Sequence, residues 1–327
     1  MIHTPVCDLL GIRHPIVLGG MAGGHTSAPL VAAVSNAGGL GTFGLGRTAP
    51  EQVPQEIAAI RERTDAPFGV NFLLFITRDE AFQAALDARP PLIAFAWARP
   101  DQDLAAYFSR AHDGGSKAMY MAGTVPEALR ARAAGADVIV AQGTEGGGHI
   151  GWMATVSLLP MVVDAVAPTP VLAAGGIADG RGLAAALALG AQGVLLGTRF
   201  LATQESPLHP NFKQAILASD GHDTVITDLP DVALASYWPG AMVRVRRNDL
   251  IARWAGREWE MRARQPEVAA GIQRARQEGD VANAMLMYGQ DAGLIHDLPP
   301  TAELVARIVH DAETLLRERL PALVRAG

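Results

Sequence analysis

Short apolar segments alternate with longer segments of helical periodicity over roughly the first two hundred residues. The apolar segments have the length of buried strands and are bounded by turn residues. The segments between them carry apolar residues at helical spacing and mostly end in polar residues or glycine. We expect strands at 15–21, 39–45, 67–74, 91–97, 117–123, 137–143, 170–176 and 193–200, and helices at 28–38, 50–64, 79–88, 103–113, 124–135, 155–167 and 180–190. Eight β/α units of this kind close into a barrel.

The alternation ends after residue 222. Residues 223–298 show no strand–helix alternation and contain several helical stretches rich in arginine, tryptophan and methionine. The last segment, 299–327, begins with a possible threonine cap and continues as a long amphipathic pattern, which predicts the eighth barrel helix. We therefore predict an α/β fold, a TIM (β/α)8 barrel with a mainly helical insertion between strand 8 and helix 8. The predicted domains are the barrel (1–222), an insertion or lid (223–298) and the C-terminal helix (299–327).

Composition narrows the class of protein. With 27 basic and 33 acidic residues the formal net charge is −6, and no basic block is present, so we expect no nucleic-acid partner. A hydrophobic content of 49% with 35 glycines fits parallel strands buried on both faces. The apolar runs are shorter than the about 20 residues that span a bilayer, so no membrane association is expected. A single cysteine and an N-terminus without a signal-peptide pattern predict a cytoplasmic protein.

A literal G-x-G-x-x-G at residues 39–44 is not interpreted as a dinucleotide fingerprint. Such a fingerprint follows a strand and opens a helix, whereas this one follows a predicted helix and is itself a predicted strand. Walker, H-E-x-x-H, C-x-x-C and G-x-S-x-G patterns are absent from the sequence, which removes the functions that they indicate.

Two glycine-containing segments lie at the ends of the seventh and eighth predicted strands. Gly175 and Gly176 lead into a helix, and Gly197 and Thr198 lie at the end of the last strand. In a β/α barrel these neighbouring loops often form a phosphate site from backbone N–H groups and a helix N-terminus. The alternative is that the glycines only make a tight turn. The occurrence of two such segments on adjacent strands favours a phosphate, carried by a nucleotide-like cofactor or by a substrate.

His149 follows three consecutive glycines just past the sixth predicted strand, on the face of a barrel that carries active sites. Glycines let a ligand approach the backbone closely, and an imidazole titrates near neutrality. We favour a catalytic role for His149, either as a base or, when charged, as a receiver of an anion. The alternative is a surface-loop histidine bonded to solvent.

Other strand ends carry weaker candidates. Asn71 and Gln142 lie late in their strands, where an amide can bond the edge of a heterocycle, and Met21 follows Gly20 where a flat ring can rest. Each alone is compatible with ordinary packing, and only the shared position connects them. We expect the insertion tryptophans, Trp238, Trp254 and Trp259, to form its core, the alternative being that one of them lines a substrate pocket. The insertion arginines, Arg244, Arg246 and Arg247, either bind an anionic substrate or form a solvated face.

Taken together, several segments resemble the nitronate monooxygenase family, also called 2-nitropropane dioxygenases, which are FMN-dependent β/α barrels. The matching segments include "HPIVLGGM", "PFGVNFLL", "GADVIVAQGTEGGGHIG" and "PVLAAGGIADGRGLAAALALGAQGVLLGTRFLAT". The resemblance implies His149 as the catalytic residue. It also implies an FMN site made of Gly20, Met21, Asn71, Gln142, Gly147, Gly148, Gly175, Gly176, Gly197 and Thr198.

The reaction that the resemblance implies is the oxidation of an alkyl nitronate or nitroalkane by O2 to a carbonyl compound and nitrite. His149 would deprotonate the nitroalkane or hold the nitronate anion. The same segments also resemble flavin-type enoyl-acyl-carrier-protein reductases and NADH:quinone reductases, so NAD(P)H is a possible second cofactor and an enoyl thioester or a quinone a possible substrate. A flavin-binding regulator without turnover is the non-enzymatic alternative.

Overall fold

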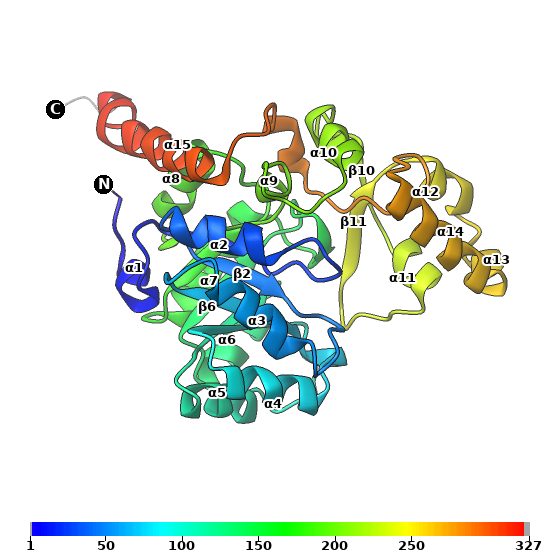
Figure 1. Ribbon diagram of the computed structural model, residues 1–327. Coiled ribbons are helices and arrows are strands. Elements are labelled where there is room, and N and C mark those ends of the chain that lie inside the picture. Colours follow the sequence, from blue (N-terminus) through cyan, green and yellow to red (C-terminus); the bar gives the residue numbers. More distant parts are fainter. Residues whose placement is uncertain (1, 324–327) are drawn as a thin grey trace.

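The chain forms a (β/α)8 barrel with an insertion over one end of it (Figure 1). The structure, a computed structural model, describes residues 2–323. The barrel strands are β1 (Ile16–Leu18), β2 (Gly41–Gly44), β3 (Phe68–Leu73), β4 (Leu92–Ala96), β5 (Lys117–Ala122), β6 (Val138–Gln142), β8 (Val171–Ala174) and β9 (Gly193–Leu196). The surrounding helices are α2 (Ala28–Asn36), α3 (Val53–Arg61), α4 (Asp79–Ala88), α5 (Leu104–Asp113), α6 (Val125–Ala133), α7 (Thr155–Val166), α8 (Gly180–Ala188) and α15 (Thr301–Thr314). The predicted fold class is confirmed.

All barrel strands are parallel and hydrogen-bond in the order β1-β9-β8-β6-β5-β4-β3-β2. Leu40 closes the ring, because its N–H donates to Ile16 O and its carbonyl accepts from Leu18 N, both at 2.9 Å. Helix α1 (Pro5–Leu10) covers the N-terminal end, where Val6 and Leu10 join the apolar residues inside the barrel. That end is therefore filled, and the opposite end is left for a site.

Local sequence signals explain where the barrel helices begin and end. Asp103 starts α5, since its Oδ1 accepts from the N–H groups of Ala105 and Ala106. Gly38, Gly135 and Gly190 end their helices with φ of 94°, 95° and 93°, a backbone conformation that side-chain-bearing residues rarely adopt. Helix α15 packs against α8 and α2 and so completes the outer ring, as expected.

The insertion is mainly helical, as predicted, and it also contains the short strands β10 and β11. After β9 the chain forms α9 (Thr198–Leu201) where the strand was expected to continue, and then α10 (Pro210–Leu217). The insertion itself comprises β10 (Thr224–Thr227), α11 (Leu229–Leu234), β11 (Met242–Arg246), α12 (Asp249–Trp254), α13 (Glu258–Ala263) and α14 (Gln265–Glu278). The 3-10 helix η2 (Gln290–Leu294) follows it. Elsewhere, the short helical segment η1 (Leu74–Ile76) follows β3, and η3 (Leu315–Arg319) and η4 (Pro321–Leu323) follow α15. The boundaries at residues 222 and 298 stay a proposal.

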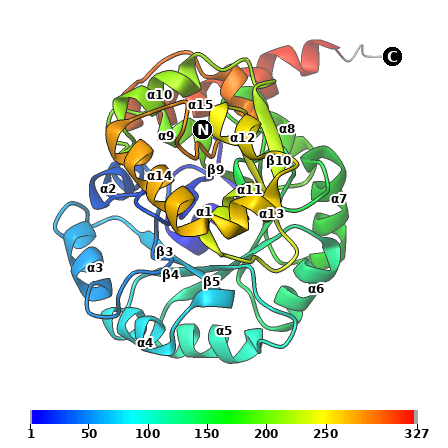
Figure 2. The ribbon, with the colours of Figure 1, turned by 90° about the vertical axis from the view of Figure 1, so that its right-hand side faces the viewer.

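Figure 2 looks onto the insertion, with α11, α13 and α14 in front of the barrel strands and α3 to α7 around them. The short strand β7 (Gly148–Ile150) connects the barrel to the insertion, because it lies in the loop after β6 and pairs antiparallel with β11. Among residues 2–323, no helix is both long and apolar enough to cross a membrane.

Candidate active site

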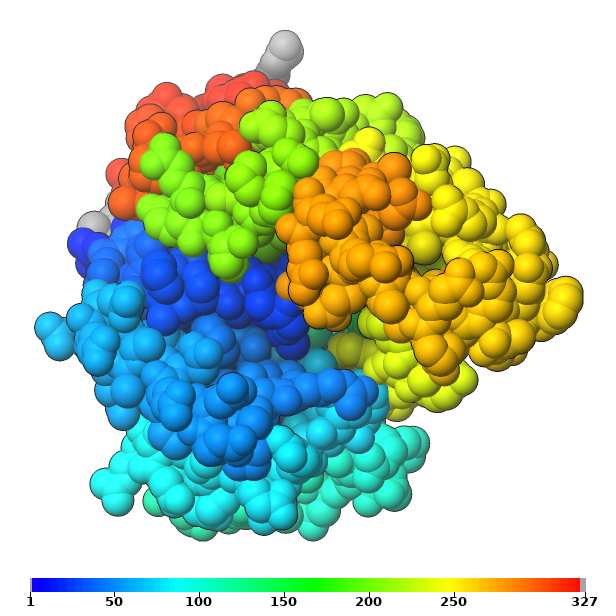
Figure 3. All heavy atoms as spheres, turned by 45° about the vertical axis from the view of Figure 1, so that its right-hand side comes forward, coloured from blue at the N-terminus to red at the C-terminus, as the bar shows by residue number. Residues whose placement is uncertain are grey.

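A cavity of about 480 Å³ lies at the carboxyl ends of the barrel strands, under the insertion. Figure 3 shows the molecule hollowed between the blue N-terminal part of the barrel and the orange and yellow insertion. All eleven residues predicted for the site line this cavity: Gly20, Met21, Asn71, Gln142, Gly147, Gly148, His149, Gly175, Gly176, Gly197 and Thr198. The structure thus brings the whole set together, and the role of each residue is a proposal.

The glycine loop before His149 is held rigidly by contacts from several elements. The Glu145 carboxylate accepts from the backbone N–H of Thr155 at 3.0 Å and from its hydroxyl at 2.9 Å, at the start of α7. Arg244 of β11 donates from Nε and Nη2 to Thr144 O, at 3.0 and 2.8 Å. A Cβ on Gly147 would lie 2.4 Å from the Tyr288 backbone, so only glycine fits there.

His149 lies in a strand, whereas the sequence indicated a loop. It is the central residue of β7 and pairs with Val243 of β11. The ladder of β10, β11 and β7 fixes the backbone of His149 relative to the insertion. The insertion therefore does more than cover the barrel, because it positions the candidate catalytic residue.

Two residues of the insertion contact the His149 ring. The Oδ1 atom of Asp231 lies 2.9 Å from His149 Nε2, and the side chains of both residues are nearly buried. The Trp238 ring stacks on the imidazole at a centroid distance of 3.4 Å and an angle of 13°. Since a carboxylate accepts hydrogen bonds, the Nε2 atom of His149 is the donor in this contact. Asp231 was not predicted, because nothing in a single sequence links positions 149 and 231.

The predicted phosphate loops have the geometry of an anion cradle. Gly175 and Gly176 have φ of 96° and 74°, and a Cβ on Gly175 would lie 2.7 Å from Gly143 O. A Cβ on Gly197 would meet only the Met21 sulfur, at 3.5 Å, and so would occupy cavity space. Small residues here leave backbone N–H groups accessible to a phosphate at the start of α9.

The amides at the strand ends fit a flat heteroaromatic ligand. Asn71 donates from Nδ2 to Gly20 O at 3.1 Å, which fixes the side chain. The Gln142 Oε1 atom is buried without a hydrogen-bond partner in the described part of the chain, and such an atom indicates a missing donor. A flavin ring can supply one, so the residues that line the cavity fit an FMN.

The tryptophans and arginines that the sequence singled out in the insertion have different surroundings in the structure, and these match the prediction only in part. Trp254 belongs to the insertion core, but Trp238 lines the cavity and Trp259 is 72% exposed. Arg244 is buried and bonded to Thr144 and Thr224, so it is neither a solvated residue nor a ligand for a substrate. Arg246 pairs with Asp223, and Arg247 is exposed.

Two arginines that sequence reasoning missed lie at the rim of the cavity. Arg47, between β2 and α3, donates from Nη2 to Ser236 Oγ at 3.4 Å, and Arg276 of α14 donates to Gly23 O. Both residues are exposed and line the cavity. A guanidinium has five N–H donors, so each retains donors for an anion.

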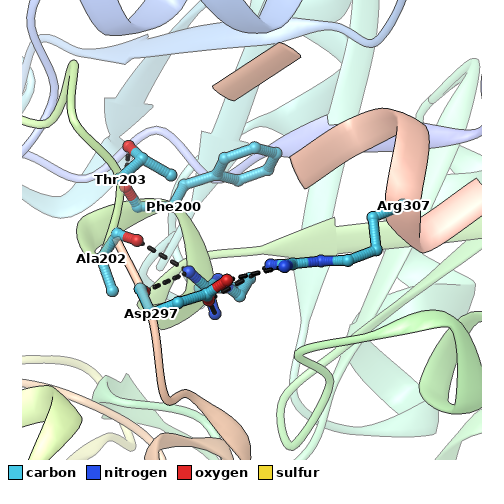
Figure 4. Close-up of polar contacts among 6 residues, drawn as sticks. Phe200, Ala202, Thr203, Asp297 and Arg307 are labelled. Carbon is cyan, nitrogen blue, oxygen red and sulfur yellow. Dashed lines mark hydrogen bonds and ion pairs between the residues drawn. The ribbon is translucent and has the colours of Figure 1, made fainter. Parts of the chain in front are cut away.

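The segment after η2 is anchored by an ion-pair cluster. Asp297 accepts from Arg199 of α9 at 3.1 Å and from Arg307 of α15 at 2.6 Å. Figure 4 shows the Asp297 carboxylate and the Arg307 guanidinium pointing toward each other. The cluster holds η2 beside α9, which places Asp291 in the cavity wall next to Thr198.

The barrel and the cavity at the carboxyl ends of its strands place the chain in the class of β/α-barrel enzymes. The model of the family described as nitronate monooxygenase matches residues 3–85 and 76–311. The chain belongs to the nitronate monooxygenase family, as the sequence resemblance implied.

Similar proteins are named for different activities. The chain is 35% identical to a "(3aS,4S,5R,7aS)-5-hydroxy-7a-methyl-1-oxo-octahydro-1H-indene-4-carboxyl-CoA dehydrogenase" of Mycobacterium tuberculosis, over 97% of this chain and 98% of that one. It is 35% identical to a probable nitronate monooxygenase of Staphylococcus saprophyticus, over 70% of this chain and 76% of that one. The structure of FabK from Thermotoga maritima is 36% identical, covers 99% of this chain and 100% of its own, and superposes with a TM-score of 0.88.

Proposed function

We propose that this oxidoreductase binds FMN in the cavity and acts on the acyl chain of a thioester, with NAD(P)H as a possible electron donor. The observation that carries the proposal is the His149–Asp231 pair, which opens onto a cavity with Arg47 and Arg276 at its rim. The two guanidinium groups suit a phosphate-bearing carrier such as coenzyme A. The relative named as a CoA dehydrogenase supports this substrate class, because the similarity covers almost the whole of both chains.

Bound FMN would supply hydride transfer, and the protein would supply binding, orientation and the proton. His149 exchanges a proton at Nδ1 with the carbon next to the thioester carbonyl, while Asp231 keeps Nε2 protonated and the ring oriented. Trp238 covers one face of the imidazole and restricts access of water to it. Arg47 and Arg276 hold the carrier outside the reacting end.

Nitronate oxidation with O2 is the second candidate function. The family model and the relative named as a probable nitronate monooxygenase support it. A protonated His149 next to Asp231 is also suited to hold a small anion. This reaction needs no phosphate-bearing carrier, so it gives Arg47 no role.

The two functions differ in what they require of the rim. We would measure turnover of a short 2-enoyl-CoA with NADH or NADPH, and oxygen uptake with a nitronate, in the wild type and in Arg47→Gln. The proposal predicts thioester turnover whose KM rises about tenfold in Arg47→Gln, while Arg63→Gln on the surface has no effect. Oxygen uptake with a nitronate, no thioester turnover and no effect of Arg47→Gln would favour the second candidate.

A further inference from the structure

A carboxyl group lies inside the predicted anion cradle. Asp291 of η2 is 6% exposed and lines the cavity together with Gly197 and Thr198. Its Oδ1 atom lies only 2.3 Å from the point where a Cβ on Gly289 would be, so the carboxyl folds back over Gly289. The N–H of Gly289 in turn donates to Thr198 Oγ at 2.9 Å. The carboxyl of Asp291 therefore belongs to the same small region as the candidate phosphate ligands.

The cations near Asp291 are already engaged. Arg199 donates to Asp297 and to the carbonyl of Ala202, and it is 3% exposed. Lys213 of α10, which packs on η2, donates to the carbonyls of Thr203 and Gln204. Within residues 2–323 no ion pair to Asp291 is formed. The other charged or titratable residues that line the cavity, within residues 2–323, are His25, Arg47, His149, Asp231 and Arg276.

Burial without a cation disfavours the charged form of Asp291. Burial raises the pKa of this carboxyl from its usual 3.8 to about 7, although hydrogen bonds from its own backbone and Thr198 and the charge of Arg199 act in the opposite direction. A phosphate monoester carries about −1.5 to −2 charges near neutral pH. A carboxylate beside it would be repelled, whereas a neutral carboxyl can donate a hydrogen bond to a phosphate oxygen.

We propose that Asp291 is a cofactor-binding residue that is protonated when FMN is bound and donates to the phosphate, so that binding takes up one proton at this carboxyl. The inference rests on the proposed FMN site. Asp291 of η2 would then be the residue that makes the affinity for FMN depend on pH.

The pH dependence has a defined sign. Below about pH 7 the free protein already holds the proton on Asp291, so binding takes up no proton at this residue and the residue causes no change of affinity with pH. Above that pH the proton must be taken from solvent, and the Kd for FMN rises by about tenfold for each further pH unit. The pKa of the His25 imidazole is lowered, chiefly by burial, so its titration lies below this range.

The test measures the Kd of FMN for the flavin-free protein between about pH 7 and pH 9. Quenching of flavin fluorescence reports the binding. The wild type should show the tenfold rise per unit, and calorimetry in two buffers of different ionisation enthalpy should show uptake of about one proton near pH 8. Asp291→Asn keeps a donor of the same shape, so its affinity should not change with pH. Riboflavin has no phosphate and should bind both proteins independently of pH.

The outcomes separate this inference from the proposed function. Wild-type FMN affinity that does not change with pH, or an equal slope in Asp291→Asn, would overturn the inference alone. A riboflavin affinity that falls with pH in the wild type but not in Asp291→Asn would also overturn it, since the carboxyl would then contact another part of the flavin. No binding of either flavin by the wild type would overturn both proposals.

Discussion

The two ends of the cavity are built in different ways. The cradle end consists of backbone and small residues of the barrel, at Gly175, Gly176, Gly197 and Thr198. The histidine end consists of side chains brought together from two regions, since His149 comes from the β6 side of the barrel and Asp231 and Trp238 come from the insertion. The cradle end suits a ligand that is the same in every turnover, such as a cofactor. Side chains at the histidine end can change without a change in the cradle.

Relatives of this chain are named for different activities. In this chain the insertion supplies the side chains that contact His149, whereas the barrel supplies the glycine cradle. Substitutions at the two ends should therefore separate cofactor binding from chemistry. The predictions below follow from that separation, in order of decreasing effect.

The largest effect is expected at the histidine end. His149→Ala removes the proton-exchanging group and should lower kcat by about a hundredfold to ten-thousandfold while FMN stays bound. Turnover and flavin content of the purified variant give the measurement, and the exposed His222→Ala is the matched control. Equal turnover in His149→Ala and the wild type would remove His149 from the mechanism.

Asp231→Asn should have the next largest effect. The amide offers Nε2 a poorer acceptor and stabilises a charged imidazole less, so kcat should fall by about tenfold to a hundredfold with unchanged FMN affinity. Steady-state kinetics and flavin titration test this, with the exposed Asp228→Asn nearby as control. A fall in FMN affinity of the same size would mean that Asp231 only supports the structure.

The opposite pattern is expected at the cradle. Gly175→Ala places a methyl group 2.7 Å from Gly143 O at a φ of 96°, so FMN affinity should fall by about tenfold or more, while kcat with saturating FMN changes less. Gly115→Ala is the matched control, because it has φ of 83° and nothing within 4 Å of the added Cβ. A large loss of kcat at saturating FMN would contradict the division between the two ends.

The smallest effect is expected at Trp238. Loss of its stacking on His149 in Trp238→Ala should change kcat/KM by about threefold to tenfold, given the usual strength of aromatic contacts. The exposed Trp259→Ala should have no effect. Equal changes in both variants would show a general effect on the insertion instead.

Sequence reasoning reached the cradle more completely than the histidine end. Gly175, Gly176, Gly197 and Thr198 lie at the ends of predicted strands, and the carboxyl ends of barrel strands meet at one face, so position along the chain predicts proximity. The same argument placed His149, Asn71 and Gln142 at that face. The eight barrel strands could be predicted because each is a short apolar run bounded by turn residues.

The insertion could not be predicted in this way. Strands β10 and β11 are short and only partly buried, and Val225 and Val245 meet through long-range pairing that a local pattern does not record. Asp231 and Asp291 appear ordinary in sequence, and only the structure shows them buried at the site. Arg244 looked like a surface or substrate residue until its bonds to Thr144 were visible.

The most direct test of the account is reoxidation of the reduced flavin in a single anaerobic turnover. Wild type and His149→Ala, each with its flavin reduced chemically, would be mixed with a short 2-enoyl-CoA and followed by flavin absorbance. The account predicts rapid return of oxidised flavin in the wild type and a rate about a hundredfold lower in the variant. No reoxidation in the wild type, or equal rates in both proteins, would contradict the claim that His149 serves thioester chemistry beside a bound FMN.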